Sequence, residues 1–204
     1  MNNVEAAPAT SEDAAWACVL TPLDHLQLKA FCQDIERFFR INPFLEFTHW
    51  RQLDDNRYQV EGRNLSQIPA FEFSYELSLN PDPHGLQINY SQGLKSNTRL
   101  VIEATENGSK LTIIDDYSHQ TQQYREQHLD EVDKSISHWA GDIQRFIVTW
   151  QRWSWLAPWR WYMRYIWQPL KPMGRRIVYI FMWITLVEIV LIGLGAAIYW
   201  LEYT

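Results

Sequence analysis

The stretch FEFSYELSL, residues 71–79, alternates apolar and polar side chains without a break. Its apolar members are Phe71, Phe73, Tyr75, Leu77 and Leu79. A period of two is that of an antiparallel strand with one buried face, because successive side chains point to opposite sides of a sheet. We therefore predict a strand here whose apolar face covers a core.

Six further stretches around it have the composition of strands, and turn signals such as Asn107-Gly108 and Asn80-Pro81-Asp82-Pro83 separate them. The additional predicted strands are 16–23, 46–53, 57–65, 86–92, 97–105 and 110–120. Between the first two of these, Asp24 to Arg40 has helical spacing and is predicted to form a helix in one or two pieces.

A long amphipathic helix is predicted after the strands. Its apolar side chains step by four and three residues: Val132, Ile136, Trp139, Ile143, Phe146, Trp150 and Trp153. A coiled coil shows the same spacing, but a single such helix after six meandering strands favours packing on the concave face of their sheet. The predicted fold class is α+β, an antiparallel sheet of about seven strands wrapped on this helix.

Two segments carry a family resemblance: FCQDIERFFRINPFLEF at 31–47 and NTRLVIEATENGSKLTIIDDY at 97–117. With the element order, they resemble the START-like helix-grip superfamily (SRPBCC), the polyketide-cyclase-like group in particular, over residues 14–151. The resemblance implies a cavity between sheet and helix that commonly holds lipids, sterols or polyketides. It implies no shared catalytic motif, so it supports the fold better than the function.

Nine residues are candidates for lining such a cavity, because the predicted strand and helix faces bring them inward. They are Trp50, Phe73, Tyr75, Tyr90, Ile102, Asp115, Tyr117, His119 and Trp139. The alternative is that these side chains fill the core completely. Asp115 and His119 share a strand face and have the chemistry of an acid/base pair, but surface hydrogen bonding of a strand-end Asp is the favoured interpretation.

No motif in the chain has the spacing of a metal site, a nucleophile with its base or a phosphate-binding glycine loop. We expect no metal and no cofactor, and for enzymatic activity the sequence leans towards none without deciding it.

A segment from Ile177 to Trp200 carries one charge, Glu188, in 24 residues. As a helix it would be roughly 36 Å long, enough to cross a bilayer. We predict a transmembrane helix over 175–201, close to the C-terminus; a buried core helix is the alternative.

The flanking charges predict the orientation. Lys171, Arg175 and Arg176 precede the span, and only Glu202 follows it, which predicts a tail-anchored protein with its N-terminal domain in the cytoplasm. Residues 1–13 are predicted to be disordered and lack the features of a signal peptide. A reducing compartment predicts that Cys18 and Cys32 are free, buried thiols.

Between domain and span, residues 152–174 are rich in Trp and carry basic but no acidic side chains. Residues 1–143 have 22 acidic and 11 basic side chains, whereas 144–176 have seven basic and none acidic. We predict an amphipathic helix over 158–168 in the membrane interface, with anionic lipid rather than nucleic acid as partner. Its membrane-interface residues are Trp153, Trp155, Trp159, Arg160, Trp161, Arg164 and Trp167. The alternative is a helix packed against the domain.

Glu188 lies near the middle of the predicted span, where a charge is costly unless it faces protein or water. Gly193 and Ala197 form a small-residue pair that permits close helix approach. We predict that all three contact a membrane-protein partner or a second copy of the chain; a protonated Glu188 in a lone helix is the alternative.

These features leave three functions open. The first is a membrane-tethered module that binds or transfers an apolar, lipid-like small molecule. The second is an accessory subunit that docks onto a membrane protein complex, and the third is an enzyme acting on a membrane-derived apolar substrate.

Overall fold

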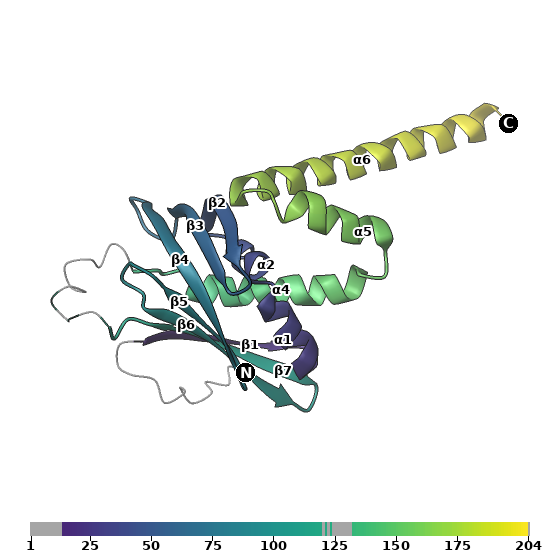
Figure 1. Ribbon diagram of the computed structural model, residues 1–204. Helices are drawn as coiled ribbons and strands as arrows, with labels where there is room; N and C mark the ends of the chain where they lie inside the picture. The colour runs from purple at the N-terminus through teal and green to yellow at the C-terminus, as the bar shows by residue number, and fades with distance from the viewer. Residues whose placement is uncertain (1–13, 120, 122, 124–131, 204) are drawn as a thin grey trace.

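Seven antiparallel strands form one sheet in the order β1-β7-β6-β5-β4-β3-β2 (Figure 1). The computed structural model describes residues 14–119, 121, 123 and 132–203. The strands are β1 Ala14–Thr21, β2 Leu45–Asp54, β3 Arg57–Asn64, β4 Phe71–Asp82, β5 Gly85–Tyr90, β6 Asn97–Thr105 and β7 Gly108–Asp116. The first strand pairs with the last, so the predicted meander of six strands is confirmed with β1 added at its far edge.

The helices fall into two groups, one before the meander and one after it. They are α1 His25–Gln33, α2 Ile35–Arg40, α4 Ile136–Trp153, α5 Ala157–Tyr162, the π-helix η2 Met163–Trp167 and α6 Pro172–Tyr203. The predicted 24–40 helix forms in two pieces because Asp34 ends α1 and its side chain caps α2, accepting a hydrogen bond from the Arg37 N–H. The fold class is α+β, as predicted.

The ends of β4 and β7 differ most from the predictions. β4 runs through Pro81 to Asp82, because its register with β3 ends at Ser78 and the missing N–H of Pro81 breaks no ladder on that side. β7 ends at Asp116 rather than near residue 120. There the Asp116 carboxylate accepts a hydrogen bond from the Ser118 N–H (2.9 Å), and this local turn stops the strand.

α4 packs on the sheet and contacts β1. The predicted stripe is buried from Ile136 through Phe146, whereas Val132 lies before the helix and Trp153 is exposed. The Trp139 indole N–H donates to the carbonyl of Phe38 (3.1 Å), and Asn42 donates to the Ser135 hydroxyl (2.7 Å). These two buried bonds fix the start of α4 to α2 and to the approach to β2.

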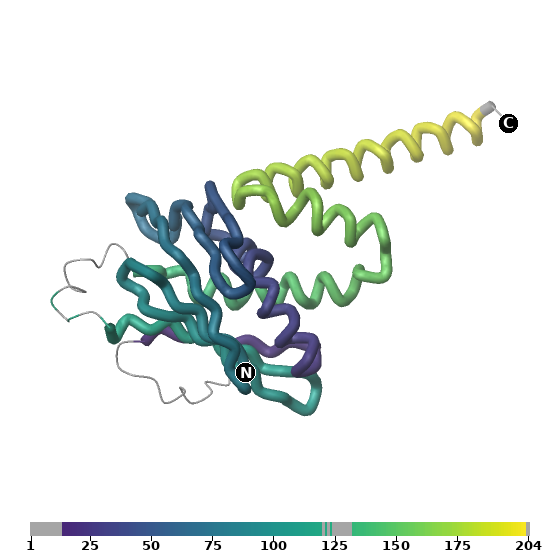
Figure 2. Tube along the Cα trace, viewed as in Figure 1, coloured from purple at the N-terminus to yellow at the C-terminus, as the bar shows by residue number. Residues whose placement is uncertain are grey.

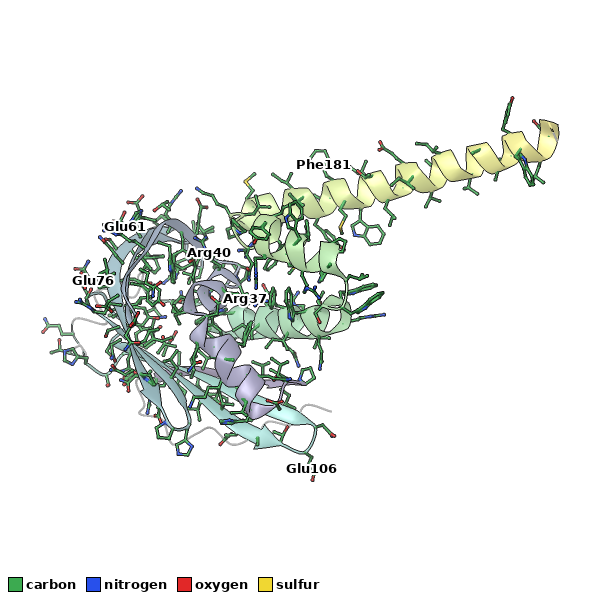
Figure 3. The ribbon with its side chains drawn as sticks, turned by 45° about the vertical axis from the view of Figure 1, so that its right-hand side comes forward. Arg37, Arg40, Glu61, Glu76, Glu106 and Phe181 are labelled. Carbon is green, nitrogen blue, oxygen red and sulfur yellow. The ribbon has the colours of Figure 1, made fainter. Side chains whose placement is uncertain are left out.

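α5 and η2 fold back along α4, and α6 then leaves the domain as a long straight helix, as the chain trace shows (Figure 2). Lys171 forms an ion pair with Glu46 of β2 (2.7 Å). Arg175 donates to the carbonyls of Trp167 (3.1 Å), Gln168 (3.0 Å) and Arg40. The first turn of α6 is therefore held against the domain, while Phe181 is exposed and the later turns of α6 lead away from the domain (Figure 3).

In the described part of the chain, α6 is the one helix long and apolar enough to cross a membrane. The candidate span covers Pro172–Glu202. Its most apolar window of 18 residues has a mean hydropathy of 2.5, and none of that window is buried within the protein. In this structure α6 does not serve as the core helix of the domain, which is α4.

The two thiols differ in environment. Cys32 of α1 is buried, and burial raises its thiol pKa to about 12. The prediction of a buried Cys18 is wrong, because β1 turns Val19 and Thr21 inward and leaves the Cys18 side chain exposed. Both cysteines are free.

Candidate functional site

A cavity of about 380 Å³ lies at one end of the sheet, where β4, the β5–β6 loop, the end of β7 and the segment before α4 meet. Six of its fifteen lining residues are aromatic, and two of its polar ones, Lys95 and Asp133, form an ion pair that we call the polar corner. The lining residues are Phe39, Leu45, Asn64, Phe71, Glu72, Phe73, Ser74, Tyr75, Tyr90, Gln92, Gly93, Leu94, Lys95, Tyr117 and Asp133.

The aromatic wall is built by neighbouring strands. Phe73 and Tyr75 stack along β4 with ring centroids 5.0 Å apart, and Tyr90 of β5 meets Tyr75 edge-on, also at 5.0 Å. Phe47 of β2 extends the row, with its centroid 5.8 Å from that of Phe73. Alternation along each strand delivers these rings to one face, so the wall is a direct result of the period-two pattern.

The polar corner is an ion-paired cluster around Lys95. Its Nζ lies 3.0 Å from an Asp115 carboxylate oxygen, 3.5 Å from an Asp133 carboxylate oxygen and 5.1 Å from the centroid of the Tyr90 ring. The Thr98 hydroxyl donates to Asp115 (2.5 Å) and lies 2.9 Å from the Tyr90 hydroxyl. We call Lys95, Asp115, Asp133, Tyr90 and Thr98 the Lys95 cluster.

Local structure explains how the β5–β6 loop delivers Lys95. Gly93 has a φ of 104°, a conformation that other residues rarely adopt, and the next side chain, Leu94, is buried. Ser96 then bonds to the Asp116 carbonyl through its N–H (2.9 Å) and its hydroxyl (2.8 Å). The loop is thus fixed on both sides of Lys95, and the Lys95 ammonium points into the domain.

Burial and ion pairing oppose one another in the Lys95 cluster. Burial alone would lower the pKa of Lys95, but the acidic groups around it, Asp115 first and then Tyr90 and Asp133, outweigh burial and raise that pKa well above its ordinary value. Burial raises the pKa of Asp115 although Lys95 acts against it, whereas for Asp133 Lys95 and the Ser135 hydrogen bonds outweigh burial and lower the pKa. Lys95 is therefore an ammonium at neutral pH and not a nucleophilic amine.

Four of the nine predicted cavity residues line the cavity: Phe73, Tyr75, Tyr90 and Tyr117. Asp115 is buried and does not itself line the cavity, but it forms an ion pair with Lys95, which does. His119 is exposed, and among the described residues Asp115 pairs with Lys95 and accepts a hydrogen bond from Thr98.

The other three, Trp50, Ile102 and Trp139, pack in or against the core and do not line the cavity. The core is thus filled around α4, while a cavity remains at one end of the sheet.

Sequence reasoning missed Lys95, Asp133 and Asn64, which also line the cavity. Thr98 carried a signal, since it alternates inward with Leu100 and Ile102 on β6. Lys95 and Asp133 lie outside the strands and helices, where no periodicity indicates direction.

The residues predicted for the membrane interface divide into two sets. Trp153, Trp155, Trp161 and Arg164 are exposed, and Arg160 donates to the carbonyl of Ser154 (2.8 Å). Trp159 and Trp167 are partly buried and pack against the core, beside the buried Met163. The segment therefore has one face on the domain and one exposed aromatic face. The three residues predicted for contacts within the membrane, Glu188, Gly193 and Ala197, are exposed on α6.

Across the described residues, no group of three His, Cys, Asp or Glu side chains is placed to hold a metal ion. The cavity combines aromatic rings with the hydrogen-bonding groups of Lys95 and Asp133, a mixture of apolar and polar lining that small-molecule sites share.

No protein-family model matches the sequence, and no curated protein matches it. Solved structures do match the fold. TTHA0849 from Thermus thermophilus shares 9% identity at a TM-score of 0.50, over 67% of this chain and 97% of that one. The Polyketide_cyc-like protein Cgl2372 from Corynebacterium glutamicum shares 16% identity at a TM-score of 0.42, over 68% and 93%. The human StarD13 (DLC2) lipid transfer and protein localization domain shares 15% at 0.39, over 66% and 75%.

The fold is START-like. The seven-stranded sheet with α1 and α2 after its first strand and α4 after its last is the helix-grip arrangement that the sequence resemblance implied. At these identities the likeness to the solved structures concerns the START-like fold alone.

Proposed function

We propose that this START-like domain is anchored to a membrane by α6 and binds an amphipathic, lipid-like molecule in the cavity beside Lys95. The observation that carries the proposal is the cavity itself, walled by the rings of β4 and β5 and ending on the Lys95 cluster. Its volume of about 380 Å³ is within the range of small-molecule sites, and it is closer to one hydrocarbon chain than to a two-chain phospholipid.

The charge of the polar corner favours a neutral head group. One ammonium faces two carboxylates, so the fully ionised cluster has an excess negative charge. A ligand carboxylate or phosphate would meet like charge in a buried site, which is costly. A ligand carbonyl can accept a hydrogen bond from Lys95, and a ligand hydroxyl can also donate one to Asp133. We infer a single-chain apolar ligand with an uncharged polar end.

The membrane part of the proposal rests on α6 and its flanks. The apolar run is preceded by three basic residues, Lys171, Arg175 and Arg176. Between the run and Thr204 the one charged side chain is Glu202. Basic residues are retained on the cytoplasmic side, so the domain faces the cytoplasm in this proposal. Trp161 of α5 and Tyr165 of η2 are exposed on the segment that leads into this flank, and aromatic side chains of this kind favour the head-group region.

The test compares two fluorescent probes that differ only at the polar end, cis-parinaryl alcohol and cis-parinaric acid, on the full chain in nanodiscs. We expect the alcohol to bind more tightly than the acid. Tyr75→Trp should abolish binding because the larger ring occupies the cavity, while the matched variant Tyr58→Trp, on β3 outside the lining, should keep it.

Failure of the parent chain to bind either probe, together with a loss of stability of about 1–3 kcal/mol in Tyr75→Trp, would refute the proposal. Co-purification of a stoichiometric protein subunit with an empty cavity would instead favour the accessory-subunit function.

A further inference from the structure

A second cavity, of about 550 Å³, lies between α4, η2 and the first turns of α6. It shares no lining residue with the first cavity. We call it the juxtamembrane cavity, because its lining includes both Arg176 and Tyr179 and so crosses the point on α6 where basic residues give way to the apolar run.

One side of the juxtamembrane cavity is basic. Arg145, Arg175 and Arg176 line it together with a single carboxylate, Asp142. Arg145 pairs with Asp142 (2.6 Å), whereas Arg176 extends the basic side along α6. Three guanidinium groups against one carboxylate leave a net positive charge at this end.

The other side is apolar. Trp159 and Met163 line it from α5 and η2, and Tyr179 and Met182 line it from α6. Arg175 lies over the Trp167 ring at 4.3 Å and is held by three backbone carbonyls, which makes the boundary between the two sides rigid. A charged end joined to an apolar wall along a helix matches the shape and chemistry of a phospholipid.

We propose that the juxtamembrane cavity binds one phospholipid with an anionic head group. The phosphate lies at Arg145 and Arg176, and an acyl chain follows Tyr179 and Met182 along α6. This inference rests on the proposed membrane span of α6, since only then do head groups reach the level of Arg176. In this proposal the two cavities bind ligands of different charge. The cavity beside the Lys95 cluster binds a neutral ligand, and the juxtamembrane cavity binds an anionic one.

The experiment uses the full chain in nanodiscs of phosphatidylcholine with a minor share of phosphatidylglycerol, released into a native mass spectrometer. We expect one retained phosphatidylglycerol per chain in preference to phosphatidylcholine. The double variant Arg145→Gln with Arg176→Gln should lower that preference roughly 30-fold, since each basic side chain at a lipid surface contributes about fivefold. The double variant Arg51→Gln with Arg63→Gln removes the same charge from exposed positions outside the lining and should keep the preference.

Equal retention of both lipids by the parent chain, or equal losses in the two double variants, would overturn the proposal. Displacement of the lipid by soluble glycerol phosphate would also overturn the proposal, because the cavity would then be a site for free phosphate. A protein bound in the cavity in place of lipid would overturn it as well.

Failure here is distinguishable from failure of the proposed function. Parinaryl alcohol binding reports the first cavity and should be unchanged in the Arg145/Arg176 variant. Extraction of the chain from membranes by alkaline carbonate would show that α6 does not span the membrane. That result would contradict the membrane anchoring on which both the proposed function and the phospholipid site depend.

Discussion

Lys95 is the residue on which the polar end of the cavity depends. Its side chain is 15% exposed, and Asp115 beneath it is 1% exposed, so neither charge has much contact with water. Such a pair adds little net stability when complete, because desolvation offsets the attraction. Removing one partner is destabilising, because the remaining charge stays buried without its counterion.

Lys95→Met should therefore destabilise the protein by about 3–5 kcal/mol, because Asp115 and Asp133 would be left buried without their cation. Lys171→Met is the matched control. It breaks the ion pair with Glu46, in which the lysine side chain is 58% exposed, and should cost at most about 1 kcal/mol. Urea unfolding of the full chain in micelles, followed by Trp fluorescence, measures both; similar losses in the two variants would mean that Lys95 is not electrostatically coupled to the carboxylates.

At the scale of the elements, a glycine in a strand and a glycine in a helix differ in the space that the surrounding atoms leave for a side chain. Gly62 lies opposite Phe47 in the β2–β3 register, and a Cβ there would overlap the Glu46 carbonyl oxygen and lie 2.8 Å from the Phe73 ring. Gly141 lies inside α4, where the nearest atom to an added Cβ is an Arg145 nitrogen at 3.9 Å.

Gly62→Ala should accordingly lower the free energy of unfolding by about 1–3 kcal/mol, because the strands must move apart to admit the methyl group. Gly141→Ala should raise it by about 0.5–1 kcal/mol, since alanine restricts the unfolded chain and favours a helix. Thermal unfolding of the two variants beside the parent tests the pair, and a shift of the same sign in both would contradict the close approach of β2 and β3 at Gly62.

Elements governed by periodicity could be predicted from the sequence, and those governed by tertiary contact could not. FEFSYELSL identified β4 and its inward face, and the apolar stripe identified α4. Of the Lys95 cluster, Tyr90 and Asp115 were among the predicted cavity residues. Lys95 and Asp133 were not, because they lie in a loop and in the approach to α4, where no periodicity indicates direction. The inward packing of Trp159 and Trp167 was kept only as an alternative, because a Trp-rich basic helix has the same pattern beside a membrane as against a domain.

At the scale of the whole molecule, the domain and α6 are mechanically joined rather than flexibly tethered. Lys171 bonds to β2, and Arg175 bonds to α2 and to the end of η2. These contacts place the juxtamembrane cavity against the start of α6 and hold the first cavity at a fixed position relative to that helix. If α6 spans a membrane, the domain is therefore held in one orientation relative to the bilayer surface.

The same contacts bear on topology, because basic residues before the apolar run belong to the folded unit and cannot cross the membrane without unfolding it. We expect the domain on the cytoplasmic side and residue 204 on the other. In sealed right-side-out vesicles, added protease should leave residues 14–151 intact, and in inverted vesicles it should digest them; a resident cytoplasmic protein is the control for sealing. Digestion of the domain in sealed right-side-out vesicles would show the opposite orientation. Digestion in neither preparation would mean that the domain resists protease, in which case a biotinylation reagent that does not cross membranes, reacting with the exposed Cys18, gives the orientation directly.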